Sequence, residues 1–230
     1  MSPRTLAGAA ALLTALAAPA TAQAVPTMAP LEPCYVTADT AQGPQSEGVQ
    51  IAASGFTPNS TVQLTIDGAP VPGGEQLQID ANGALLPLPA VPAPFVEEGS
   101  KPFTVALTET GNPANTVSAT AKSTALGVSV KPQSAKPSDR VRFKGLGFTK
   151  EKPIYAHYIH KGELRKTVRL ARQPRECGGF EVHRRQIPIR RPELGNWIVQ
   201  FDQSKRFRRP AAGGIVYVRL LIELKLVPPR

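Results

Sequence analysis

The sequence lacks the short motifs that mark common enzyme sites. It has no G-x-S-x-G nucleophile elbow, no glycine-rich phosphate loop before a helix, and no cysteine beside a histidine motif. The H-x-H, H-E-x-x-H and C-x-x-C patterns are also missing, so we expect His157, His160 and His183 to be solvated and predict no metal and no cofactor. A protein without catalytic activity is expected, with a hydrolase built from carboxylates of distant segments as the alternative.

Cysteine is scarce too, with only Cys34 and Cys177 in 230 residues. In an oxidising compartment an even number of cysteines favours a disulfide. Because the two residues lie in different halves of the chain, we predict a bond that straps one half to the other. Two separate buried thiols, or disulfides between chains, are the alternatives.

Long apolar runs are absent after the first residues. Arg4 precedes a short Ala- and Leu-rich stretch, and Ala22-Gln23-Ala24 has the small side chains of a cleavage site. Residues 1–24 are therefore predicted to be a secretory signal peptide. The longest later run, Gly213 to Val227, is interrupted by charged residues, so no transmembrane segment is predicted. We expect a secreted, extracytoplasmic protein.

One pattern does occur twice in the sequence. Residues 49–68 (VQIAASGFTPNSTVQLTIDG) and residues 141–162 (VRFKGLGFTKEKPIYAHYIHKG) each contain an alternating strand, a Gly-Phe-Thr corner, and a second alternating strand that ends near a glycine. Later segments match in the same order, with Gly83 on Gly179 and Phe103 on Trp197. A repeat of this size indicates two copies of one module.

Strand signals run through both copies. Apolar and polar residues alternate at Val62, Leu64 and Ile66, and again along a long final strand from Val216 to Leu226. No stretch of ten residues after the predicted signal peptide has helical periodicity. Many short strands with frequent turn signals predict an all-β fold of the β-sandwich type. The buried face of such strands is where we place Phe56, Phe148 and the lone Trp197.

The strand–GFT(P)–strand–DG unit, followed by D-x-N-G and an alternating strand, resembles the immunoglobulin-like modules of bacterial secreted and surface proteins, a broad group that includes IPT/TIG-like domains. The resemblance covers nearly all of both modules. It implies two tandem immunoglobulin-like β-sandwich domains with a spacer, adhesion or ligand-binding role. We place a signal peptide at 1–24, a flexible Pro-rich arm at 25–33, an acidic domain at 34–123 and a basic domain at 124–230.

The two predicted domains carry opposite charge. Residues 25–123 hold two Lys and Arg against nine Asp and Glu, a net of about −7, whereas residues 124–230 hold 24 against eight, about +16. Such asymmetry indicates an electrostatic role for the basic part. Its clustered cations are the candidate anion-binding residues: Arg165, Lys166, Arg184, Arg185, Arg190, Arg191, Lys205, Arg206, Arg208 and Arg209.

Two functions remain open from the sequence. The first is a non-catalytic structural or interaction protein of the bacterial cell envelope or medium, whose partner is another surface protein. The second is a binding protein whose Arg-rich domain recognises an anionic glycopolymer or a lipid headgroup surface. Nucleic acid is a poorer partner, because the predicted signal directs the chain out of the cytoplasm and no aromatic-rich RNA-binding motif is present. A merely solvated surface, or a basic domain docked on its acidic neighbour, would explain the charge without a ligand.

Overall fold

The computed structural model describes residues 25–40, 42–148, 151–172, 174–209 and 217–225, so the predicted signal peptide lies outside the described residues. In this part the chain forms strands and one 3-10 turn, η1 (Glu176–Gly178), without an α-helix. The predicted all-β fold class is confirmed. No helix among the described residues is long and apolar enough to cross a membrane.

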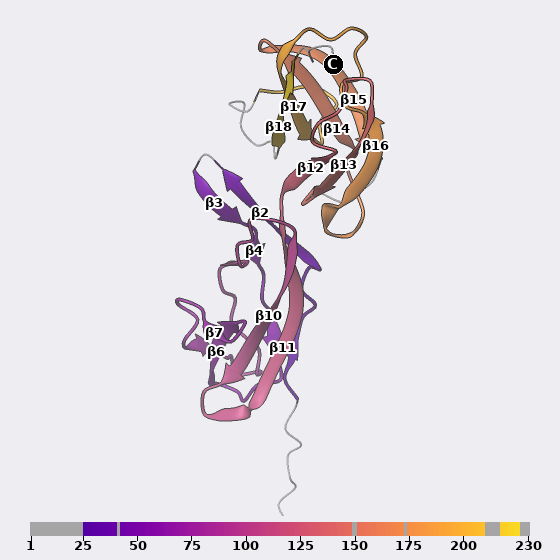
Figure 1. The fold of residues 1–230 in the computed structure, drawn as a ribbon. Helices are drawn as coiled ribbons and strands as arrows, with labels where there is room; N and C mark the ends of the chain where they lie inside the picture. The colour runs from indigo at the N-terminus through magenta and orange to yellow at the C-terminus, as the bar shows by residue number, and fades with distance from the viewer. Residues whose placement is uncertain (1–24, 41, 149–150, 173, 210–216, 226–230) are drawn as a thin grey trace, which may run out of the picture.

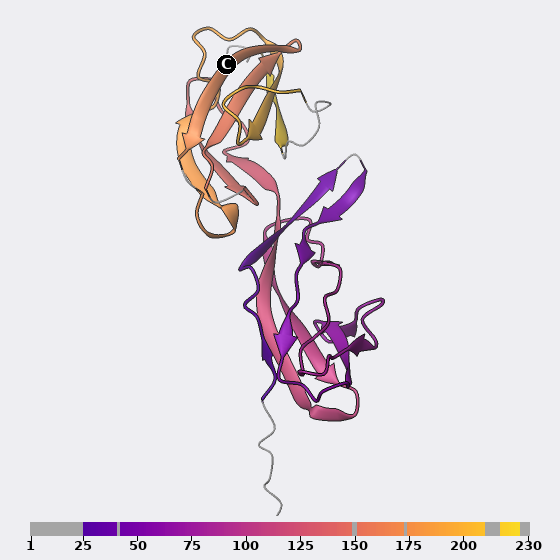
Figure 2. The same cartoon turned by 180° about the vertical axis from the view of Figure 1, so that it is seen from behind.

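Two hydrophobic cores follow one another along the chain. The first gathers around Phe56, Leu64 and Phe103, and the second around Phe148 and Trp197. Figures 1 and 2 show the two corresponding bodies arranged end to end. We call them the first and second modules. The residue boundaries proposed for the domains remain a prediction.

The first module is built on one large sheet with the strand order β3-β2-β11-β10-β6-β7, from which β8 branches by pairing with β6. Its strands are β2 (Cys34–Thr40), β3 (Gly43–Ser46), β6 (Thr61–Ile66), β7 (Ala69–Pro70), β8 (Leu77–Gln78), β10 (Ser100–Glu109) and β11 (Asn112–Ala125). Two short pairs complete it, β1 (Thr27–Met28) with β5 (Ala53–Ser54), and β4 (Gly48–Val49) with β9 (Val91–Pro92). All pairs are antiparallel except β2 with β11.

Residues 25–33 differ from the flexible arm expected there. Thr27 and Met28 pair with β5, and the side chains of Met28 and Leu31 pack against the first core. Proline removes backbone donors but does not prevent a short edge pairing, which is why a Pro-rich composition misled the prediction.

The second module packs a three-stranded sheet, β12-β13-β16, against a four-stranded sheet, β15-β14-β17-β18. Its strands are β12 (Gly127–Lys131), β13 (Arg140–Leu146), β14 (Ile154–His160), β15 (Glu163–Ala171), β16 (Phe180–Arg185), β17 (Gly195–Asp202) and β18 (Val218–Leu224). Every pair is antiparallel. Seven strands divided in this way are the layout of an immunoglobulin-like sandwich. In β18 the predicted alternation is present, while Val216 and Leu226 lie outside the described residues.

The two copies of the repeat share one strand register. Leu64 lies opposite Leu107 in the first module, and Ala156 lies opposite Phe201 at the equivalent place in the second. The same alignment put Trp197 in the core, where it is 2% exposed. The two copies therefore agree in their cross-strand neighbours as well as in their sequence. The repeat is therefore structural as well as sequential.

The Gly-Phe corner closes both modules in the same way. Phe56 and Phe148 are each 3% exposed, and their N–H groups donate to Gly83 O at 3.1 Å and Gly178 O at 3.3 Å. Both of these glycines have positive φ, 80° and 66°, and a Cβ on either would collide with the carbonyl oxygen of the corner phenylalanine. The partner of Gly83 is thus Gly178 and not Gly179, as the sequence alignment had it.

The modules are joined at two places. β11 runs on through Leu126 into β12, and the Leu126 N–H donates to Thr37 O at 2.7 Å. A disulfide also links Cys34, at the start of β2, to Cys177 in η1, 143 residues further along the chain. This is the inter-module strap that the sequence predicts.

Docking of the basic domain on its acidic neighbour does not account for the charge. Among the described residues, the ion pair between the modules is Lys122–Glu176 at 3.5 Å. Its lysine comes from the acidic first module and its glutamate from the basic second module. Among the described residues, the arginine clusters of the second module therefore form no ion pair with the first module.

Candidate functional site

All ten predicted anion-binding residues are exposed on the second module. They are Arg165 and Lys166 on β15, Arg184 and Arg185 at the end of β16, Arg190 and Arg191 between β16 and β17, and Lys205, Arg206, Arg208 and Arg209 after β17. Within the described part of the chain only Arg165 forms an ion pair, with Glu193 at 3.6 Å. Most of this positive charge is left without a carboxylate partner.

A cavity of about 480 Å³ opens between β15 and β16, which are edge strands of the two facing sheets. Its lining residues are Ser138, Arg140, Tyr158, Val168, Arg184, Arg185 and Pro188. We call it the arginine pocket. It brings the predicted pair Arg184 and Arg185 together with Arg140 and Tyr158, neither of which the sequence pattern marked as functional.

The register of β13 and β16 determines where the arginines of the arginine pocket stand on the sheet. Arg140 lies directly opposite Arg185, and Arg184 lies opposite Val141, which is fully buried. Since residues opposite one another share a face of the sheet, Arg184 stands on the inward face, where alternation calls for an apolar residue. Like charges placed opposite each other destabilise a strand pair by roughly 0.2–1 kcal/mol. No ion pair of the described residues involves any of these three arginines.

Tyr158 is the buried polar group of the arginine pocket. It is 0% exposed, and its hydroxyl has no hydrogen-bond partner among the described residues. Burial raises the pKa of the Tyr158 phenol above its usual value, so the hydroxyl stays neutral and can donate a hydrogen bond. An unmade hydrogen bond of this kind costs about 1–3 kcal/mol. A polar ligand that accepted a hydrogen bond from this hydroxyl would remove that cost.

The prediction of solvated histidines is wrong for two of the three. His157 is 0% exposed and His160 is 2% exposed, whereas His183 is exposed as expected. His157 does lie on the outward face of β14, opposite in direction to the core residues. Residues 203–209, however, fold across that face, and the ring of Phe207 packs 5.6 Å from the imidazole. A covering segment of this sort leaves no periodic signal in the sequence.

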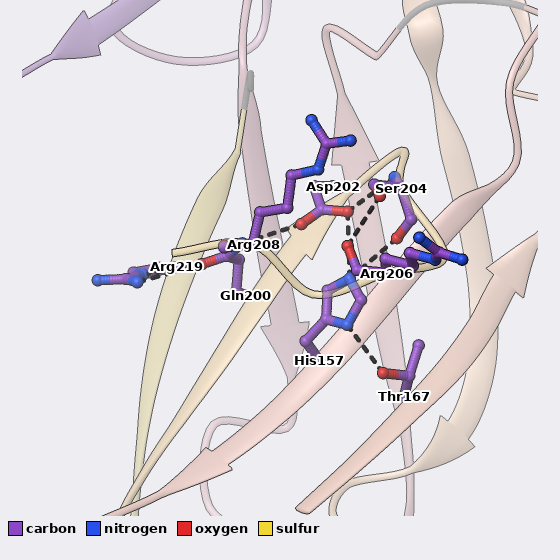
Figure 3. A network of polar contacts seen from close by, with 8 residues as sticks. All are labelled: His157, Thr167, Gln200, Asp202, Ser204, Arg206, Arg208 and Arg219. Atoms are coloured by element: carbon purple, nitrogen blue, oxygen red, sulfur yellow. Dashed lines mark hydrogen bonds and ion pairs between the residues drawn. The ribbon is translucent and has the colours of Figure 1, made fainter. Parts of the chain in front are cut away.

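Figure 3 shows the polar network beneath this segment. His157 Nε2 lies 3.1 Å from both Asp202 Oδ1 and the Ser204 carbonyl oxygen, so this nitrogen carries the proton and donates. On the other side of the ring, Nδ1 lies 2.9 Å from the Thr167 hydroxyl. Gln200 Nε2 donates to Asp202 Oδ2 at 2.9 Å. The imidazole and the carboxylate thus lock each other in place.

The same network fixes the backbone of the basic segment. Gln200 Nε2 also donates to the Arg208 carbonyl oxygen at 3.1 Å, and the Ser204 hydroxyl donates to the Arg206 carbonyl oxygen at 2.8 Å. Arg219 donates through Nε and Nη2 to Gln200 Oε1, at 3.2 and 3.1 Å. The buried polar groups therefore hold the main chain while the side chains of Arg206 and Arg208 stay exposed.

Asp202 is charged in this setting. Burial opposes its ionisation, but hydrogen bonds from His157, from Gln200 and from the Ser204 N–H outweigh it, and the pKa of the carboxyl lies below its usual value. Thr167, His157 and Asp202 have the hydroxyl–imidazole–carboxylate order of hydrolytic triads. Because His157 and Asp202 are both 0% exposed, no substrate reaches them, and the role that fits is structural.

A second cluster surrounds Glu193. Its carboxylate contacts Lys161 at 2.9 Å, Arg165 at 3.6 Å and His160 Nε2 at 3.4 Å. The hydrogen bond and charge of Lys161 are the main causes of a lowered pKa at Glu193. His160 stacks on Trp197 at 4.7 Å, and the indole N–H donates to the Glu193 carbonyl oxygen at 2.9 Å. The cluster gives Arg165 a carboxylate partner that it shares with Lys161.

Cys34, Glu176 and Cys177 lie close enough together to resemble a metal site. The two sulfurs are bonded to each other, so neither is a thiolate that could bind a metal ion. This group carries no further role.

Comparison with known proteins adds little. No protein-family model matches the chain, and no curated protein does. Among solved structures, it is similar to a tetra-tandem repeat in the extending region of a large adhesion protein, at 15% identity and a TM-score of 0.29, over 84% of this chain and 49% of the other. The chain spans about half the length of that structure. A similarity this low carries no argument about fold or function.

Proposed function

We propose that the protein is a non-catalytic, extracytoplasmic interaction protein in which the two modules form one rigid rod. The double connection between the modules carries this proposal. A chain joined only through Leu126 could pivot at that residue. The disulfide between Cys34 and Cys177, whose Cα atoms are 5.3 Å apart, adds a second covalent link and removes that freedom.

The disulfide also supports an extracytoplasmic location. Such bonds persist in oxidising compartments and are rare in a reducing cytosol. The predicted signal peptide points to the same location. A spacer or a presenting scaffold needs this combination of two independent cores and a stiff joint, and needs no reactive centre.

Small-angle X-ray scattering tests the rod. The oxidised protein should fit a single extended arrangement of the two modules, because both links are closed. The variant carrying Cys34→Ser and Cys177→Ser should keep two folded modules but require a mixture of arrangements. Equal flexibility in the two samples would contradict the proposal. Circular dichroism of the variant controls for loss of folding.

A second function is favoured by the exposed cations. The arginine and lysine side chains of the second module have few carboxylate partners, and the buried network around His157 holds the segment 203–209 in one conformation. Preordered cations bind a polyanion with less loss of conformational entropy than a mobile tail does. The ligand class is an anionic glycopolymer of the envelope or a lipid headgroup surface.

Retention on immobilised heparin, a generic polyanion, tests this second function. Retention should fall steeply between low and moderate salt, because binding releases counterions. A variant with glutamine at Lys205, Arg206, Arg208 and Arg209 should elute earlier. The control has the same four-charge loss at Lys101, Lys136, Lys152 and Lys225, and should elute later than that variant. Elution of the unmodified protein with neutral proteins of its size would refute polyanion binding.

A further inference from the structure

We propose that the arginine pocket binds a phosphate group, held by Arg140, Arg184, Arg185 and the hydroxyl of Tyr158. This inference deepens the polyanion-binding function and rests on it for the natural source of the phosphate. The strand register, the unpaired cations and the buried phenol support the site independently of that function.

The positions of the arginines point to a bound anion. Arg140 and Arg185 are direct neighbours across the β13–β16 ladder, and Arg184 occupies an inward-facing place opposite the buried Val141. Arg184 donates one hydrogen bond to the His183 carbonyl oxygen at 3.2 Å, which leaves its remaining donors free for a ligand. By the same alternation Arg140 and Arg185 stand on the opposite face of the sheet from Arg184, so the three exposed side chains line the cavity from both sides of the sheet edge and are available to an anion there.

Tyr158 is the independent sign of a ligand. The side chain is 0% exposed, it lines the cavity, and its hydroxyl lacks a partner among the described residues. Native proteins satisfy the great majority of buried hydroxyls, so a missing partner needs a cause. The hydroxyl is closed to solvent in this structure, so it donates to an oxyanion in the cavity only once the side chains that line the cavity have moved aside.

The rim of the arginine pocket is held in place by Lys166. This residue lies opposite Tyr158 in the β14–β15 ladder, and its Nζ donates to the Pro188 carbonyl oxygen at 2.6 Å. Pro188 belongs to the cavity lining. Lys166, one of the predicted anion-binding residues, therefore also fixes the loop that borders the site.

Phosphate fits this donor set better than a carboxylate. Guanidinium groups pair with phosphate oxygens in a bidentate manner, and a phosphate monoester has close to two negative charges against three arginines. A carboxylate offers one charge and two oxygens. The volume of about 480 Å³ exceeds that of a lone phosphate and leaves room for the glycerol or sugar unit that bears it.

Calorimetric titration of the full mature chain with inorganic phosphate tests the site. We expect saturable binding of one phosphate per chain, with acetate binding more weakly. Arg184→Gln should weaken phosphate binding about tenfold or more, as loss of one charge-assisted pair does. Tyr158→Phe should weaken it several-fold and leave the melting temperature of the phosphate-free protein unchanged or higher. Arg208→Gln, outside the arginine pocket, should change the Kd less than twofold.

Two further ligands distinguish the sources of the phosphate. Glycerol phosphate that binds more tightly than inorganic phosphate would indicate a polymer or headgroup unit in the cavity. Binding to vesicles of phosphatidic acid that is lost in Arg184→Gln would assign a lipid surface. Vesicle binding that is unaffected by Arg184→Gln, together with tight glycerol phosphate binding, would assign a soluble or polymeric source.

Several results would overturn the inference. Phosphate binding that does not saturate, or that Arg184→Gln and Arg208→Gln weaken equally, means surface electrostatics without a site. A lower melting temperature of phosphate-free Tyr158→Phe means that the hydroxyl serves the fold. Steep salt-dependent heparin retention without phosphate binding would remove the pocket and keep the polyanion function. Phosphate binding without heparin retention would keep the arginine pocket and remove the polyanion function.

Discussion

At the scale of single residues, the buried network of His157, Gln200 and Asp202 decides how the basic segment is presented. Each of these side chains points outward from its strand, which alone would predict a solvated position. They are buried because residues 203–209 cross over them and supply carbonyl oxygens as partners. A fully satisfied buried network rigidifies its surroundings. The positions of Arg206 and Arg208 therefore depend on these buried polar groups.

Replacing Asp202 by asparagine should expose this dependence through pH. The folded-state pKa of Asp202 is lowered, so its contribution to stability is present above the unfolded-state pKa of about 3.9 and is lost as pH falls through the folded-state value. At neutral pH, Asp202→Asn should lower the free energy of unfolding by about 2 kcal/mol, as loss of a buried charged acceptor does.

Urea denaturation at several pH values measures this effect. The gap between the wild type and Asp202→Asn should shrink as the pH falls below about 4. Asp39→Asn, at an exposed position, should show a small gap throughout. A gap for Asp202→Asn that is equal at pH 3 and pH 7 would show that the carboxylate charge is not what stabilises the segment.

At the scale of elements, the Gly-Phe corner is the device that both modules share. Gly178 combines positive φ with close contact to the Phe148 backbone, whereas Gly179 has an ordinary backbone conformation and borders the flexible side chain of Leu146. Gly178→Ala should destabilise the protein by more than about 2 kcal/mol, because strain and collision act together. Gly179→Ala should cost less than about 1 kcal/mol.

Chemical denaturation of the two alanine variants compares these neighbours directly. The two substitutions have the same chemistry and adjoining positions, so each controls for the other. If Gly179→Ala proved the more damaging, the sequence alignment with Gly83 would be right and the structural assignment wrong.

The sequence was most informative about elements. Alternation of apolar residues located β6, β10, β14, β17 and β18, and the repeat related them in one register, because strand period and core packing are local properties. The disulfide followed from the even cysteine count. The arginine pocket was only half predicted, since Arg184 and Arg185 form a visible pair but Arg140 has no basic residue adjacent to it in the sequence. Their meeting depends on the β13–β16 register, and Tyr158 looked like an ordinary core residue.

The burial of the histidines could not be predicted from the sequence. Outward-facing positions on a strand are solvated only if nothing crosses them, and a crossing loop of polar and basic residues has no periodic signature. The sequence thus placed His157 on the correct face and still mispredicted its burial. The basic clusters are exposed, as their charge indicates. The contact of Arg165 with Glu193 and that of Lys166 with Pro188 could not be predicted, because both depend on how distant segments pack together.

At the scale of the whole molecule, the joint between the modules decides whether the protein behaves as a rod. A stiff joint fixes the direction in which the second module presents its cations relative to the first module (Figures 1 and 2). The ion pair between Lys122 and Glu176 is exposed and contributes little, roughly 0–1 kcal/mol. We therefore attribute the proposed rigidity of the joint to the continuous β11–β12 connection together with the Cys34–Cys177 bond.

The rotational diffusion of the two modules, measured by ¹⁵N relaxation on the oxidised protein, shows whether the joint is stiff. One common, anisotropic tumbling is expected for amides of both modules. Once Cys34 and Cys177 are both replaced by serine, each module should tumble separately and faster. Independent tumbling of the modules in the oxidised protein, or no change on removing the disulfide, would contradict the proposal of a rigid rod.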